Sequence, residues 1–441
     1  MSYFASALVA LLAAEYLMAT GYGYPTAAIA APETLVVVHV VAIGWLSLLM
    51  CGALFQFVPV LIARPLYSNT LPLPALGCLL AGLAALLSGF LQLAGHITIG
   101  FGFFPVAAVL LATGFGLAVW NLGRTLWAAR PLPLSARFVV VGLLSMIATV
   151  ALGVVFAIVL GGFSSHSHFL DVTAFGVPIH AVAGLGGWLT FTAIGVSYRL
   201  LAMFMLGPEL EGRSTRGVLY VGATALATAI VGGVAAICMD GNVAAVLGGA
   251  AILGLVALAL YARDILYLYR VRKRRTIELN SRMAAVALLN LMAAAVLIVV
   301  LLALGRLGRH AGTVVFLVSF GWLSGLALAK LYKIVAFLTW LECYGPVLGK
   351  TATPRVQDLV VERRAIKWFI LYFVAVWAAA AALFFDGALL FRVSAGLMGL
   401  ATLGIVIQLV QTRRLADVNP ALRLPRGVRR PRLLLTRIQH A

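Results

Sequence analysis

Long apolar segments alternate with short polar connections along almost the whole chain. Runs that can cross about 30 Å of hydrocarbon as helices occur at twelve places. They cover residues 4–21, 33–62, 73–95, 99–128, 135–162, 176–206, 216–239, 242–270, 282–304, 311–341, 366–385 and 387–411. Two boundaries depend on single acidic turns, Asp240-Gly241 and Asp386-Gly387. The pattern predicts an all-α polytopic membrane protein with about twelve transmembrane helices in one transmembrane domain, residues 1–412.

A short phrase recurs inside these segments: a histidine, followed a few residues later by Gly-Trp-Leu-Ser or Gly-Trp-Leu-Thr. The three copies are His39 with residues 44–47, His180 with residues 187–190, and His310 with residues 321–324. The copies lie about 140 residues apart, and internal periodicity is a strong guide to architecture. We therefore expect three related groups of four helices, at about residues 1–130, 131–270 and 280–412.

Composition supports the membrane class. The chain is 63% hydrophobic and only 10% charged, and its mean hydropathy is +1.09. A soluble domain of 441 residues cannot bury so much apolar surface. The four cysteines show no CxxC spacing, so they suggest neither a disulfide framework nor a thiolate metal site.

The basic residues predict the orientation. On this topology all but three of the 32 Lys and Arg residues lie on one side, the exceptions being Arg306, Arg309 and Arg392. The positive-inside rule then places both termini in the cytoplasm, followed there by a basic tail, residues 413–441. The net charge of +19 is explained by topology and requires no nucleic acid. The basic loops and tail either only fix the orientation or also bind anionic lipid or a partner protein.

Six of the seven histidines fall on the outer side, and His440 alone is cytoplasmic. This clustering suits a haem or copper site near the outer leaflet, because two imidazoles on facing helices can hold a b-type haem in a bundle. The leading candidates are His39, His180 and His310. The competing interpretation is that a histidine near a helix end simply faces lipid headgroups. The loop pair His166 and His168 is a weaker copper candidate, and a solvated loop is the alternative.

The tryptophans of the repeated phrase lie deeper than the histidines. Trp45 and Trp188 either line a cofactor pocket or pack in an apolar seam between helices. The small residues 183–187 after His180 permit close approach by a flat ligand or by a neighbouring helix.

Few other polar groups lie within the apolar segments. Lys330 and Lys333 share one helix face, and we expect them to extend to the inner membrane interface. Glu15 is the acidic residue that we expect in the membrane core. Walker, GxSxG and HExxH motifs are absent from the sequence.

Twelve helices, a three-fold repeat and histidines near the outer ends of helices 2, 6 and 10 together resemble subunit I of the haem-copper oxidase superfamily, which includes cytochrome c oxidase and the large subunit of nitric oxide reductase. Residues 39–64 (HVVAIGWLSLLMCGALFQFVPVLIAR) and 180–205 (HAVAGLGGWLTFTAIGVSYRLLAMFM) look like the helix 2 and helix 6 segments of short oxidase-like bacterial proteins. The resemblance implies that His39 is an axial ligand of a haem b and that His180 occupies the place of a copper ligand. A looser similarity is to the NnrS family, which is linked to nitric oxide.

Two departures from the superfamily pattern limit what the resemblance implies. The seventh predicted helix, 216–239, contains no histidine where the superfamily has a pair. His180 is followed by Ala-Val-Ala-Gly, without the glutamate or tyrosine of the superfamily. The usual three-histidine copper site is therefore not available, and we do not expect full oxygen reduction.

Three interpretations follow. The first is a haem-binding protein of the bacterial inner membrane, with His180 or His310 opposite His39. It would act in electron transfer or in handling nitric oxide or another diatomic gas, with a periplasmic cytochrome or respiratory-complex subunits as partners. As an enzyme it would be an oxidoreductase. The second is a structural or copper-handling assembly subunit without a cofactor. The third is a transporter, although transporter repeats usually come in halves.

Overall fold

The structure is a computed structural model that describes residues 1–424, 428 and 431–434. The regular secondary structure in this part of the chain is entirely helical. Twelve of its helices are long and apolar enough to cross a membrane. The prediction of an all-α polytopic membrane protein is confirmed. Residues 425–427, 429–430 and 435–441 of the basic tail, His440 among them, lie outside the described residues.

The observed spans follow the predicted ones to within a few residues. They are Ser2–Thr20, Pro32–Ile62, Pro72–Leu93, Phe103–Trp127, Leu134–Leu160, Val177–Met205, Arg213–Cys238, Val243–Val271, Leu279–Ala303, Ala311–Val347, Glu362–Phe384 and Ala388–Arg413. Both acidic turns separate helices as expected. Asp240 and Asp386 adopt left-handed backbone conformations, with φ of 51° and 57°, and such a residue ends a helix.

The chain forms two compact units. Unit 1 is Met1–Val37 with Ile277–Ala441, and unit 2 is Val38–Thr276. Unit 1 contains the start of α2 (Pro32–His39) together with α1 (Ser2–Thr20), α13 (Leu279–Ala303), α14 (Ala311–Phe316), η4 (Leu317–Ser324), α15 (Gly325–Tyr344), α16 (Glu362–Phe384) and α17 (Ala388–Arg413). The prediction of three groups of four helices stays a prediction.

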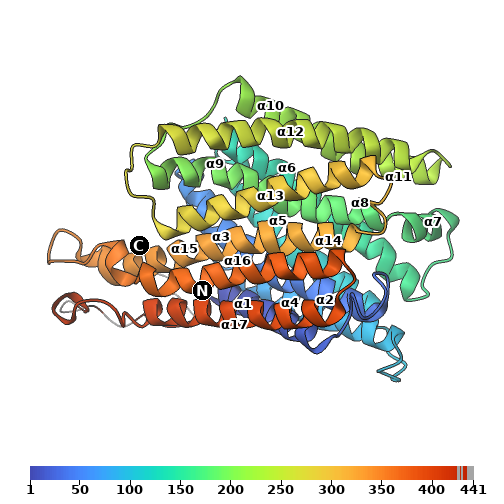
Figure 1. The fold of residues 1–441 in the computed structure, drawn as a ribbon, viewed down its shortest axis with the longest axis horizontal. Coiled ribbons are helices and arrows are strands. Elements are labelled where there is room, and N and C mark those ends of the chain that lie inside the picture. The colour runs from blue at the N-terminus through green and yellow to red at the C-terminus, as the bar shows by residue number, and fades with distance from the viewer. Residues whose placement is uncertain (425–427, 429–430, 435–441) are drawn as a thin grey trace. The chain divides into compact units, whose positions relative to one another are not determined.

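Unit 2 begins within the second span. Its elements are η1 (Val40–Ser47), α3 (Leu48–Ile62), α4 (Pro72–Leu93), α5 (Phe103–Trp127), α6 (Leu134–Leu160), α7 (Ser167–Phe175), α8 (Val177–Ala181), η2 (Val182–Phe191), α9 (Thr192–Met205), α10 (Arg213–Ala227), η3 (Thr228–Gly232), α11 (Gly233–Cys238) and α12 (Val243–Val271). Helices α10 and α12 pack side by side (Figure 1). Helix α6 packs along η2 and α9. A Cβ added at Gly195 would lie 2.2 Å from Cβ of Phe138, so only glycine permits the close approach of α9 to α6.

Each copy of the Gly-Trp-Leu phrase lies in a π-helical segment. Trp45 is in η1, Trp188 in η2 and Trp322 in η4. The π-helix is rare and often marks functional sites. Its wider turn disturbs the α-helical hydrogen bonds, and in hydrocarbon the affected backbone groups must find partners inside the protein. The sequence repeat therefore marks a repeated backbone feature.

The partners are visible in η4, where three consecutive carbonyls accept side-chain hydrogen bonds. Ser324 Oγ donates to the Ser319 carbonyl (2.7 Å), the Tyr372 hydroxyl to the Phe320 carbonyl (3.1 Å), and Asn290 Nδ2 to the Gly321 carbonyl (3.1 Å). Trp377 Nε1 in turn donates to Asn290 Oδ1 at 2.9 Å. The last of these bonds fixes the orientation of the Asn290 amide.

The first and last spans of the chain pack together in unit 1. Helix α1 lies against α17, and α16 and α17 run side by side (Figure 1). Arg392 Nε donates to the carbonyl of Ala19 at 3.2 Å. Near the other end of α1, Ser2 Oγ donates to the carbonyl of Leu434 at 2.8 Å. Unit 1 is therefore closed by segments from the two ends of the sequence.

A small cap covers one end of unit 1. The end of α15, the following connection and the residues after α17 share a buried cluster of Cys343, Tyr344, Leu359, Leu415 and Val418. Beside it, Arg413 is only 4% exposed. Its guanidinium donates to Thr339 Oγ1 (3.1 Å) and to a Glu342 carboxylate oxygen (2.9 Å). The start of the basic tail is thus part of the folded unit, whatever it contributes to orientation.

We expect Arg413→Gln to lower the thermal midpoint of the detergent-solubilised protein. The change leaves the partly buried Glu342 without its cation, and breaking a buried ion pair costs about 3 kcal/mol. Arg414→Gln is the matched control, because Arg414 is exposed and its replacement removes the same charge. Equal midpoints for the two variants would contradict a structural role for Arg413.

Candidate functional site

His39 occupies the junction between an α-helix and a π-helix. It is the last residue of α2 and immediately precedes η1. Its side chain is half-buried, and its ring lies against Phe90 of α4 with the centroids 5.0 Å apart. An aromatic ring at this distance restricts the orientations open to the imidazole.

His180 occupies the corresponding junction in the second copy of the phrase. It lies in α8, two residues before η2 begins. Its ring packs against Phe156 of α6 at a centroid distance of 5.3 Å. Helix α6 also approaches the ring at Gly153, where an added Cβ would lie 3.5 Å from Cε1 of the His180 imidazole. Nδ1 of His180 is buried and makes no hydrogen bond within the described part of the chain, although the backbone of Thr149 lies nearby.

Unit 2 brings His39 and His180 together. The two imidazoles are close enough for a positive charge on one to repel a positive charge on the other. Such a pair is stable when both rings are neutral, and the neutral imidazole is the form that binds metals. A buried polar nitrogen without a partner calls for an explanation, and an absent ion is one of the recognised explanations. The pair is therefore the candidate functional site.

The other candidate histidines have surroundings of their own. His310 belongs to unit 1, where it directly precedes α14 and is 7% exposed. Its ring stacks on Phe384 at 4.4 Å and 14°, so a structural contact accounts for its burial. His166 and His168 are exposed, with ring centroids 5.5 Å apart, at the start of the short helix α7. The sequence predicted only a loop in this region. Groups of three or more His, Cys, Asp or Glu side chains that can hold a metal are absent from the described residues.

The tryptophans of the two phrases in unit 2, Trp45 and Trp188, are buried in the interior. Trp188 Nε1 donates to Ser47 Oγ at 3.0 Å, so the tryptophan of the second phrase bonds the serine of the first. The small residues after His180 also have a packing role, because a Cβ at Gly187 would lie 2.4 Å from Ser145 of α6. At Gly187, therefore, the small residue permits the close approach of the neighbouring helix α6.

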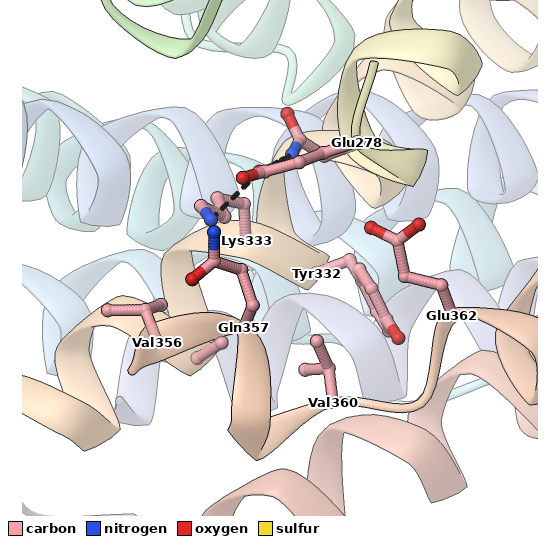
Figure 2. Close-up of a pocket in the computed structure, with 9 residues that line it drawn as sticks. Glu278, Tyr332, Lys333, Val356, Gln357, Val360 and Glu362 are labelled. Carbon is pink, nitrogen blue, oxygen red and sulfur yellow. Dashed lines mark hydrogen bonds and ion pairs between the residues drawn. The ribbon is translucent and has the colours of Figure 1, made fainter. Parts of the chain in front are cut away.

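A second polar site lies in unit 1. Lys333 and Glu278 form an ion pair of 2.8 Å with little exposure of either side chain. Figure 2 shows them at a small pocket lined by Glu278, Asn280, Tyr332, Lys333, Ala336, Val356, Gln357, Val360 and Glu362. Lys330 is buried, and Lys333 pairs with Glu278, which directly precedes the membrane-spanning helix α13. The expectation that Lys330 and Lys333 extend to the membrane interface stays a prediction.

The short helix η6 (Val356–Leu359) forms one wall of this pocket. Arg355 caps it, because the Arg355 backbone N–H donates to Asp358 at 2.9 Å and the Arg355 guanidinium donates to the same carboxylate at 3.2 Å. The backbone hydrogen bond, helped by the guanidinium, holds the pKa of Asp358 below its usual range.

Unit 2 also contains a polar cluster that the sequence pattern did not predict. The Asp264 carboxylate of α12 accepts hydrogen bonds from the Tyr198 hydroxyl (2.9 Å) and from Thr215 Oγ1 (3.0 Å). The hydroxyls of Ser197 and Tyr261 lie 2.6 Å apart beside it. An aspartate inside the predicted span 242–270 was the available signal. Its hydroxyl partners come from other helices and are not evident from local pattern.

A scan of protein-family models and a search of curated proteins found no match to this chain. The chemistry of the site is therefore inferred from its residues and their geometry.

We expect Ser47→Ala to destabilise unit 2 by about 1–3 kcal/mol, because it leaves the buried Trp188 N–H without an acceptor. Trp188→Phe removes the donor and also some volume. The double variant should lose less stability than the sum of the two single variants, measured as thermal midpoints in one detergent. Strict additivity would show that the hydrogen bond contributes nothing.

Proposed function

We propose that the chain is a haem-binding protein of the bacterial inner membrane in which His39 and His180 are the axial ligands of a haem b. The observation that carries the proposal is the electrostatic interaction between these two imidazoles within unit 2, where the His180 ring is buried. Two histidines from facing helices are an established ligand set for b-type haem. This assignment selects His180, rather than His310, as the partner of His39.

The residues around the pair suit such a role. Phe90 and Phe156 orient the two imidazoles, and the apolar surroundings limit access by water. A bound haem would supply reversible one-electron chemistry and affinity for diatomic gases. His39 and His180 would hold such a haem, and a group held by two histidines would favour electron transfer over the binding of nitric oxide. A periplasmic cytochrome or a subunit of a respiratory complex would then be the electron partner.

One observation supports a second candidate, a copper-handling or assembly subunit without haem. His166 and His168 are exposed and their rings are neighbours, and two imidazoles on an accessible surface can accept and release a copper ion. On this alternative the pair formed by His39 and His180 would be a packing feature.

We expect a dithionite-reduced minus oxidised optical spectrum of the purified protein to show a sharp α-band of low-spin b haem. His39→Ala and His180→Ala should each abolish this band, because each removes one axial ligand. His96→Ala is the control, since His96 is exposed and lies outside the pair. Its spectrum should match that of the unaltered protein.

Haem content after expression in a haem-replete host decides between the two candidates. A folded protein without haem, whose copper content falls in a His166→Ala, His168→Ala double variant, would contradict the haem proposal and support copper handling. A haem band that survives in both His39→Ala and His180→Ala would assign the haem to other ligands.

A further inference from the structure

Glu15 is a carboxylic acid in the interior of unit 1. It lies in α1 and is 1% exposed. Thr402 Oγ1 of α17 donates a hydrogen bond of 2.9 Å to Glu15 Oε1. The second oxygen, Oε2, is buried and has no hydrogen-bond partner in the described part of the chain. The carboxyl group therefore has one polar contact and one unused oxygen.

The depth of Glu15 follows from its neighbours. Thr402 lies near the middle of α17 (Ala388–Arg413), and Tyr372 lies near the middle of α16 (Glu362–Phe384). Tyr372 is close enough to interact electrostatically with Glu15, and Gly399 of α17 lies beside the carboxyl. Since both α16 and α17 are membrane-spanning helices, the Glu15 carboxyl is near the middle of the membrane.

Within the part of the chain that the structure describes, the neighbours of Glu15 carry no positive charge that could compensate a negative charge on an ionised carboxylate. Helix α17 contributes Thr402 and Gly399, α16 contributes the tyrosine Tyr372, and Lys or Arg partners of Glu15 are absent from the described residues. An uncompensated charge in a hydrocarbon environment is expensive, and ionisable residues there are usually functional. A small cation on Oε2 removes this cost, and the proton is the only cation that needs neither a cavity nor further ligands.

We propose that Glu15 is a proton-binding site at the middle of unit 1, with the exchangeable proton on Oε2 and Thr402 donating to Oε1. Loss of the proton places a negative charge near Tyr372, whose hydroxyl donates to the Phe320 carbonyl in η4. The protonation state of Glu15 is thereby coupled to the π-helical segment of the third phrase. This site is independent of His39 and His180, which belong to unit 2, so a protein without haem leaves the proposal intact.

Infrared difference spectroscopy of the full-length protein in lipid, recorded between mildly acidic and alkaline pH, tests the proposal. We expect a carboxylic C=O band that shifts in D₂O and is lost in Glu15→Gln. In Thr402→Val the band should move to higher frequency, because the carbonyl oxygen loses its hydrogen-bond donor. Asp264→Asn is the matched control: it removes the other buried carboxyl group described above and should leave the band in place.

Two results would overturn the proposal. One is an identical C=O region for the unaltered protein and a folded Glu15→Gln variant, because then Glu15 carries no proton. The other is a carboxylate band lost in Glu15→Gln that depends on added Na⁺ or K⁺, because then a metal cation occupies Oε2. Thermal midpoints of all variants establish that each one is folded before its spectrum is interpreted.

Discussion

Inside a bilayer every backbone carbonyl needs a hydrogen-bond donor from the protein itself, and this requirement shapes the most distinctive part of the structure. The wide turns of the π-helical segments would be costly in lipid without added partners. In η4 the donors include Tyr372 and Asn290, and Trp377 holds Asn290 in place. The contact between Trp188 and Ser47 joins two such segments in unit 2. The polar side chains of these spans are thus structural necessities as well as candidate chemistry.

The position of the candidate ligands depends on the same feature. An α-helix turns by about 100° per residue, and a π-helical turn contains an extra residue. Side chains before and after the wide turn therefore fall on faces that α-helical periodicity does not predict. His39 directly precedes η1, and His180 lies two residues before η2. Because the wide turn follows the candidate histidine, the histidine and the tryptophan of one phrase can point in different directions and contact different neighbouring helices.

Much of the fold could be predicted from the sequence, because membrane spans depend on local apolar length. Even the breaks at Asp240 and Asp386 were evident from single turns. The site was predictable only in part: the repeated phrase identified His39 and His180, but not that η1 and η2 are π-helical. Contacts between distant helices, such as Tyr198 with Asp264 or Lys333 with Glu278, leave no periodic signal, since each partner is an isolated polar residue in its own segment.

The packing of α1 against α17 has a consequence for biosynthesis. Glu15 and Thr402 are 387 positions apart, and chains are made from the N-terminus onwards. Helix α1 therefore enters the membrane long before its partner exists, and the whole of unit 2 is synthesised in the interval. Until the last span arrives, the face of α1 that packs against α17 has only lipid, insertion machinery or temporary neighbours to cover it. A nascent chain stopped before Ala388 would carry eleven of its twelve spans and still lack a finished unit 1.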